Sequence, residues 1–227
     1  MFETMGGRRM SLPTPYYQDS AVTIYHGDCR EIMQHLPRAD LLLTDPPYGI
    51  RYSSDYSCGS TKAELGWSQI AGDDDLSARD SVIGEFSEWA VFGSHKVAHP
   101  QGWRGVLVWD KGPASGMGDL SFPWKLSFEL IFVSGCEWRG PRAEGVLKGH
   151  HVVTRACMGR VHPNEKPVSL LAAIIAKHPA QTILDPFAGS GTTGRAAKDL
   201  GRKAILIEIE ERYCEIAAKR MAQEVLL

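Results

Sequence analysis

The sequence contains a short polar motif whose residue types could activate a weak nucleophile. Asp45-Pro46-Pro47-Tyr48 closes the apolar run 39–44, which is short and unalternating and is typical of a strand buried on both faces. Two successive prolines cannot continue a sheet, so we expect the motif at the carboxyl end of that strand. In open α/β sheets this is where ligands bind.

These residue types suit attack by the exocyclic amine of a nucleobase, whose lone pair is delocalised into the ring. Asp45 and the carbonyl of Pro46 could accept its two N–H groups and favour a tetrahedral nitrogen. Tyr48 offers a flat face for stacking, which is typically worth about 1–3 kcal/mol per base. The same four residues can also be a plain turn with a helix-capping aspartate, so a second site has to decide.

A glycine-rich turn forms the second motif. Residues 182–184 are typical of a short buried strand, and Asp185-Pro186-Phe187-Ala188-Gly189-Ser190-Gly191-Thr192-Thr193-Gly194 follows it. A helix is then expected through Leu200, and a strand over 203–207 that closes at Glu208. Glycines let the backbone approach a ligand closely, and a carboxylate at the tip of the next strand can accept both hydroxyls of a ribose.

The three glycines Gly189, Gly191 and Gly194 also satisfy the dinucleotide pattern G-x-G-x-x-G, so an NAD-dependent oxidoreductase is the alternative from another class. Against it, no second mononucleotide half follows, Asp185 would set a negative charge near a pyrophosphate, and the first motif would have no role. The absence of a lysine after the glycines excludes a P-loop. S-adenosylmethionine, with an adenosine end and a cationic amino-acid end, fits better.

In that fit Glu208 holds the ribose, Phe187 packs near the cofactor, and Asp185 with the glycine turn faces the methionine end. Asp28 follows the β-rich stretch 21–26 and could accept from the adenine amine. It could equally cap a helix over 29–36, and the two roles can coexist.

Length, charge and cysteine use bound the class of protein. The chain has 227 residues and a net charge of −2, which fits one α/β domain over 15–227, with 1–14 expected as a disordered leader that lacks the apolar region of a signal peptide. Five cysteines without Cys-x-x-Cys spacing favour reduced thiols in the cytoplasm and neither a disulfide frame nor a zinc site. No apolar run is long enough for a membrane span.

Basic side chains gather towards the third quarter of the chain, over about 139–162. Such a run is often only a solvated surface, but in a slightly acidic chain it is the best candidate for a phosphate-contacting face. The pair His150-His151 lacks partners at metal-ligand spacing, so we expect no metal. The expected contacts with nucleic-acid phosphates are Lys111, Arg139, Arg142, Lys148, Arg155 and Arg160.

The remaining patterns supply the elements that position these motifs. Strands are expected over 105–109 and 128–133 and helices over 168–177 and 210–223. The apolar spacing of residues 78–98 predicts a further helix. The polar stretch 49–77 predicts a long loop, which could close over a substrate.

Taken together, Asp45-Pro46-Pro47-Tyr48 and Asp185-Pro186-Phe187-Ala188-Gly189-Ser190-Gly191 resemble the motifs of the amino-group DNA methyltransferases. The order of the two motifs resembles the circularly permuted β class, and the resemblance extends from about Pro15 to Arg220. It implies a Rossmann-like α/β fold with a seven-stranded, mostly parallel sheet and helices on both faces. The implied cofactor contacts are Asp28, Lys166, Asp185, Phe187, Gly189, Gly191, Thr192 and Glu208.

The resemblance also implies methyl transfer from S-adenosylmethionine to a base flipped out of double-stranded DNA, of the kind used in restriction-modification. Adenine N6 is the expected acceptor, because many cytosine-N4 members have Ser where this chain has Asp45. Cytosine N4, RNA and a non-catalytic DNA-binding remnant are the alternatives. The region between the strand at Glu129 and His162 is short for target recognition, which suggests a short target, help from the 49–77 loop, or a homodimer.

Overall fold

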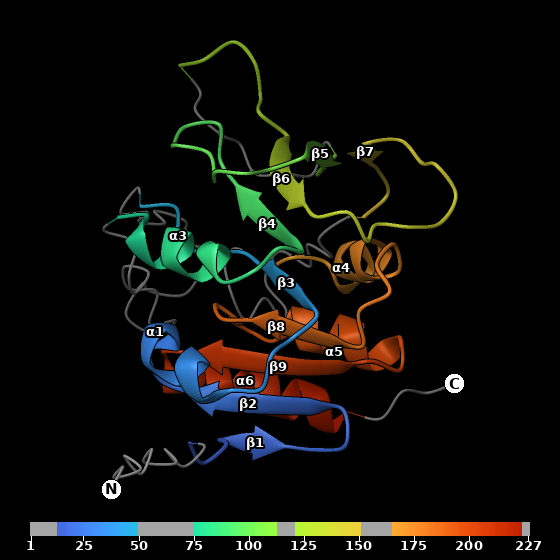
Figure 1. The fold of residues 1–227 in the computed structure, drawn as a ribbon. Helices are drawn as coiled ribbons and strands as arrows, with labels where there is room; N and C mark the ends of the chain where they lie inside the picture. The colour runs from blue at the N-terminus through green and yellow to red at the C-terminus, as the bar shows by residue number, and fades with distance from the viewer. Residues whose placement is uncertain (1–12, 50–74, 113–120, 151–164, 224–227) are drawn as a thin grey trace, which may run out of the picture.

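A single mixed sheet runs through the computed structural model, which describes residues 13–49, 75–112, 121–150 and 165–223 (Figure 1). The spatial order of the strands is β1-β2-β9-β8-β3-β4-β6-β5-β7. The strands are β1 (Tyr17–Gln18), β2 (Val22–His26), β3 (Leu41–Thr44), β4 (Trp89–Gly93), β5 (Gly105–Asp110), β6 (Phe128–Ser134), β7 (Val146–Leu147), β8 (Thr182–Asp185) and β9 (Lys203–Glu208).

Parallel pairing joins the five strands β2, β9, β8, β3 and β4 in the centre of this sheet. Strand β6 runs antiparallel between β4 and β5, β1 is antiparallel to β2, and β7 is parallel to β5. The expected Rossmann-like α/β class is confirmed. The described residues form nine strands where seven were expected, and the two-residue strands β1 and β7 at the edges account for the difference.

Helices cover both faces of the sheet, as expected (Figure 1). The helices α4, α5 and α6 contribute to one apolar cluster and α1 and α3 to the other. Strand β3 lies between the two clusters, and Leu41, Leu42 and Leu43 are fully buried, as the unalternating apolar run predicted. The helices are α1 (Cys29–Ile32), followed by the 3-10 turn η1 (Met33–His35), α3 (Ser77–Gly84), α4 (Val168–Ile175), α5 (Thr192–Asp199) and α6 (Glu211–Ala222).

The prediction of one helix over 78–98 was wrong. Helix α3 ends at Gly84, and Trp89–Gly93 forms β4, which pairs with β3 and β6. The whole of β4 is buried, so both of its faces are apolar. Strand β4 is apolar on both faces and follows α3 after only a few residues. Its apolar residues therefore continue the helical spacing of α3, and the sequence pattern predicted one long helix.

Candidate active site

The two motifs meet at the carboxyl edge of the parallel strands. Asp45 follows β3, Asp185 ends β8, Glu208 ends β9 and Asp28 follows β2, and these four strands are neighbours in the sheet. Parallel neighbours end at the same edge, so the four carboxylates share one cleft of about 900 Å³. The position is the one that open α/β sheets use for ligands.

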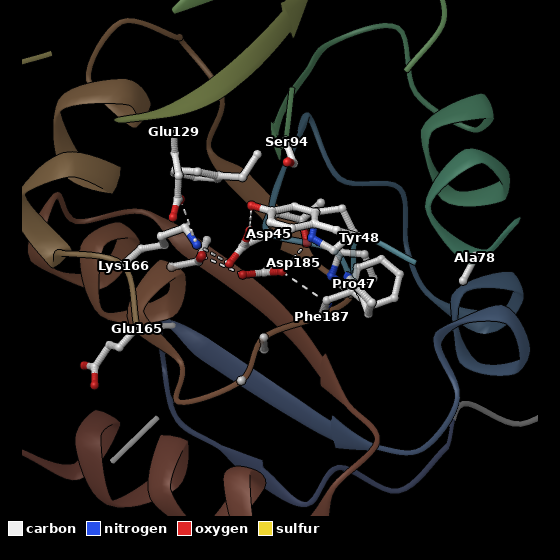
Figure 2. A pocket seen from close by; sticks show the side chains of 18 of the residues that line it. Asp45, Pro47, Tyr48, Ala78, Ser94, Glu129, Glu165, Lys166, Asp185 and Phe187 are labelled. Atoms are coloured by element: carbon white, nitrogen blue, oxygen red, sulfur yellow. Dashed lines mark hydrogen bonds and ion pairs between the residues drawn. The ribbon is translucent and has the colours of Figure 1, made fainter. Parts of the chain in front are cut away.

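Asp45 lies at the centre of the cleft and both of its oxygens are engaged (Figure 2). The Tyr48 hydroxyl donates to its Oδ1 at 2.8 Å, and the Lys166 ammonium donates to its Oδ2. Burial raises the pKa of Asp45 above its ordinary value, although Lys166 and Tyr48 act in the opposite direction. Its carboxylate is therefore held in place by the protein and can also take up a proton more readily than a surface aspartate.

Lys166 joins Asp45 to a second, partly buried carboxylate (Figure 2). It precedes α4, its side chain is only 6% exposed, and Nζ lies 3.1 Å from Oε2 of Glu129 on β6. The other oxygen of Glu129 accepts from Lys111 Nζ at 2.6 Å. Burial works against the charge of Lys166, but Asp45 and Glu129 outweigh it and raise the pKa of the ammonium.

The structure thus forms an alternating chain of charges, Lys111–Glu129–Lys166–Asp45. Lys166 was expected among the cofactor contacts and Lys111 among the DNA contacts, and both also line the cleft. Glu129 was not anticipated at all. A single carboxylate inside the apolar strand run 128–133 is the signal that could have pointed to it, because a charge in such a strand needs a buried partner.

Asp185 acts as a clamp between the two motifs. It is 3% exposed, and it accepts from the hydroxyls of Thr44 at 2.6 Å and Thr193 at 2.5 Å and from the backbone N–H of Phe187 at 3.2 Å. Burial raises the pKa of Asp185 to about 6, against the effect of these three donors. Asp185 therefore ties β3 to α5 and fixes the start of the glycine turn.

The glycine turn packs so tightly that one of its positions admits no side chain. Gly191 has φ 78° and a Cβ there would lie 2.7 Å from Cβ of Ala217 on α6. Gly189 also has a left-handed backbone, with φ 50°, a conformation that glycine adopts without steric cost. The turn is therefore held close to α6 while its other side lines the cleft together with Thr192.

Glu208 fixes the turn from the neighbouring strand. Its Oε2 accepts from the N–H of Gly189 at 2.7 Å and its Oε1 from the N–H of Glu210 at 2.8 Å. Burial raises the pKa of this carboxyl, and the two backbone donors counteract it. The carboxylate lines the cleft at the strand tip, where the sequence placed a ribose partner.

Asp28 caps α1, one of the two roles left open for it. Its Oδ1 accepts from the N–H of Arg30 at 2.8 Å, and its Oδ2 pairs with the Arg30 guanidinium at 2.6 Å. The side chain also lines the cleft, as does half-buried Phe187. Pro47 and Tyr48, labelled with Phe187 in Figure 2, line the same cleft.

The basic residues expected to contact DNA are only partly described. Arg139, Arg142 and Lys148 are exposed and lie outside the cleft lining, with Arg139 next to Glu137 and Lys148 4.0 Å from Glu144. Arg155 and Arg160 lie outside the described residues, as does most of the expected 49–77 loop. In the described ranges no helix is long and apolar enough to cross a membrane.

Comparison with known proteins agrees with this fold. The DNA methylase family model matches residues 108–219. Protein YubD of Escherichia coli (strain K12), a candidate methylase by its name, is 30% identical over 214 residues, which cover 86% of this chain and 88% of YubD. The type II methyltransferase M.ScaI of Streptomyces caespitosus is 29% identical over 269 residues, covering 95% and 86% of the two chains.

Two solved structures share the fold. The PvuII DNA methyltransferase, named as cytosine-N4-specific, superposes with a TM-score of 0.65 at 18% identity and covers 94% of this chain and 90% of its own. The M1.HpyAVI-SAM complex has a TM-score of 0.58 at 24% identity and covers 88% and 99%.

The chain shares its Rossmann-like sheet with solved DNA methyltransferases, and its two motifs lie together at one edge of that sheet. The chain belongs to the N6/N4 DNA methylase family. The comparisons give no support to the oxidoreductase alternative, and the family name covers adenine-N6 and cytosine-N4 acceptors alike.

Proposed function

We propose that this protein is a DNA methyltransferase that transfers a methyl group from S-adenosylmethionine to N6 of an adenine flipped out of double-stranded DNA. The observation that carries the proposal is the position of Asp45. Its carboxylate lies in the same cleft as the glycine turn, fixed by Lys166 and Tyr48. In that position the Asp45 carboxylate can bind the acceptor amine close to the methyl donor.

The residues of the cleft fit S-adenosylmethionine. Glu208 and Asp28 end neighbouring strands and supply acceptors for the hydroxyls and amine of an adenosine. The turn at Gly189 offers backbone without side chains beside them. When bound, the cofactor supplies an electrophilic methyl group on a cationic sulfonium. The buried carboxylates around the turn favour such a cation in a site of low dielectric.

Asp45 would act on the acceptor amine. With Oδ2 held by Lys166, Oδ1 is the oxygen that faces Tyr48 and can accept an N–H of the base. The Pro46 carbonyl would take the second N–H, so that the nitrogen lone pair points towards the donor. The methylated amine then has to lose a proton, and the raised pKa of Asp45 makes its Oδ1 a suitable acceptor.

The target base would leave the duplex to reach this cleft, since the amine is inaccessible within a base-paired stack. Tyr48, Pro47 and Phe187 all line the cleft (Figure 2) and offer flat or apolar surfaces for the base. The choice of adenine rests on the aspartate at position 45, since many cytosine-N4 members have Ser there. The PvuII enzyme, cytosine-N4-specific by its name, shares the fold and makes cytosine N4 the second candidate.

Nucleoside analysis tests the acceptor directly. The protein is incubated with unmethylated bacterial DNA and isotope-labelled S-adenosylmethionine, and the digested DNA is analysed by mass spectrometry. We expect label in N6-methyladenine. Label in N4-methylcytosine would show that cytosine N4 is the acceptor instead. Label only in a parallel RNA sample would show that RNA, and not DNA, is the substrate. Thermal stabilisation by NAD and none by S-adenosylmethionine would overturn the cofactor assignment.

A further inference from the structure

Three large apolar side chains that line the cleft are exposed to solvent. Phe122, Trp124 and Leu126 precede β6 in the connection from β5, and they are 47%, 68% and 42% exposed. We refer to these three residues as the aromatic rim. All three line the same cleft as Asp45 and the glycine turn.

The residues of the aromatic rim form one ordered surface and are not isolated exposed side chains. The rings of Phe122 and Trp124 contact each other with centroids 5.4 Å apart and planes 54° apart. Antiparallel pairing of β5 with β6 places Asp110 opposite Phe128 and so fixes the strands on either side of the connection. Exposed apolar groups gathered in this way along a cleft usually mark a binding surface.

The chain links the rim closely to the reacting centre. Glu129, which pairs with Lys166, lies three residues after Leu126 on β6. Cations accompany the apolar groups, since Lys125 lies between Trp124 and Leu126 in the chain and exposed Lys96 lines the same cleft. Flat apolar faces with neighbouring cations are the features that bind unstacked bases and their phosphates.

We propose that the aromatic rim binds the DNA substrate by stacking on nucleobases next to the target, which lose their stacking partner when the target base enters the cleft. The proposal rests on the proposed function, because it requires a DNA substrate with a flipped base. Trp124, as the more exposed ring, would make the larger contact, and Phe122 would support it from one side. The rim would thereby stabilise the flipped state and not the cofactor.

The test compares Trp124→Ala with Trp103→Ala. Trp103 is 46% exposed but does not line the cleft, so it controls for loss of an exposed tryptophan. The probes are a duplex that carries the methylated site of the wild-type enzyme and the same duplex with 2-aminopurine at the target base. Measured quantities are duplex affinity by fluorescence anisotropy, 2-aminopurine emission, and S-adenosylmethionine affinity by calorimetry.

We expect Trp124→Ala to weaken duplex binding by about 10- to 100-fold and to reduce the 2-aminopurine signal, with cofactor affinity unchanged within about twofold. Trp124→Phe should recover much of the loss and Trp124→Leu little, because stacking requires a ring. Trp103→Ala should match the wild type. These readouts separate stacking from a loss of folding, which would lower cofactor affinity as well.

Two results would overturn the proposed role of the aromatic rim and leave the proposed function intact. One is a wild-type enzyme that methylates DNA and a Trp124→Ala variant with the same duplex affinity and emission. The other is a dimer that becomes a monomer in Trp124→Ala by sedimentation, since the rim would then bind a second copy of the chain. A wild-type protein that leaves no methyl group on DNA would instead overturn the proposed function and the rim together.

Discussion

Replacing Lys166 with methionine tests whether the charge chain Lys111–Glu129–Lys166–Asp45 controls the chemistry at Asp45. Methionine keeps most of the length and apolar volume of the lysine but removes its ammonium, which contacts Asp45 and lies 3.1 Å from Glu129. Glu129 retains Lys111 at 2.6 Å. The change therefore falls mainly on Asp45, which is left with only the Tyr48 hydroxyl as a described hydrogen-bond donor.

The size of the effect follows from burial. The Lys166 and Asp45 side chains are 6% and 26% exposed, and removing one partner of a buried ion pair typically costs about 3–5 kcal/mol. Because burial already raises the pKa of Asp45, loss of the cation must raise it further. If a cost of about 3 kcal/mol fell entirely on the ionisation of Asp45, it would correspond to roughly 2 pH units. We therefore expect Lys166→Met to move the acidic limb of the pH profile upward by about 1–2 pH units.

The assay is the pH dependence of kcat/KM for DNA methylation. The proposed mechanism uses Asp45 as the carboxylate, so the acidic limb should move to higher pH in Lys166→Met. At a given pH on that limb, activity should be about 10- to 100-fold lower than in the wild type, and it should recover as the pH rises. Lys111→Met is the matched control, since it keeps the contact of Lys166 with Asp45. An unchanged acidic limb in Lys166→Met, with normal cofactor affinity, would refute the reasoning.

Further predictions concern other parts of the cleft and the basic surface. The folded-state pKa of Asp185, about 6 against an ordinary 3.8, means that stability present below about pH 4 is lost as the pH rises through 6. The unfolding free energy of the wild type relative to Asp185→Asn should therefore fall by about 3 kcal/mol over that window, and denaturant unfolding showing a rise would contradict it. Glu208→Ala should weaken S-adenosylmethionine binding at least about tenfold, and calorimetry showing unchanged affinity would remove Glu208 from the cofactor site. Arg139→Gln and Lys148→Gln should each reduce the slope of log DNA affinity against log salt concentration by about one phosphate contact. An unchanged slope would show that these residues do not contact DNA.

The central elements of the fold could be predicted because their patterns are local. The buried strand before Asp45 is apolar without alternation, and the glycine turn lies between a short strand and a helix, so each is recognisable from adjacent residues. Strand β4 was not recognised, because its burial on both faces depends on pairing with β3 and β6, which come from distant parts of the chain. The tertiary partners, and not the local sequence, decide between helix and strand there.

The same division applies to the site. Asp45, Asp185 and Glu208 lie at the ends of strands, and this position was enough to predict that they share one cleft. Glu129 and Lys166 are separated by a long stretch of chain and meet only because the fold brings β6 and the segment before α4 together. The charge chain that holds Asp45 is therefore a product of the fold, and no spacing in the sequence indicates it.

The most direct test of the central claim is a comparison of Asp45→Asn with the wild type for two quantities, S-adenosylmethionine affinity and single-turnover methylation of DNA. Asparagine keeps the size of the side chain but loses its charge and its ability to take up the amine proton. We predict cofactor affinity within a few fold of the wild type and a rate reduced by at least about a thousandfold, in the range of combined electrostatic and general-base effects. A variant that methylates DNA at close to the wild-type rate would contradict the role of Asp45 on which the proposed mechanism depends.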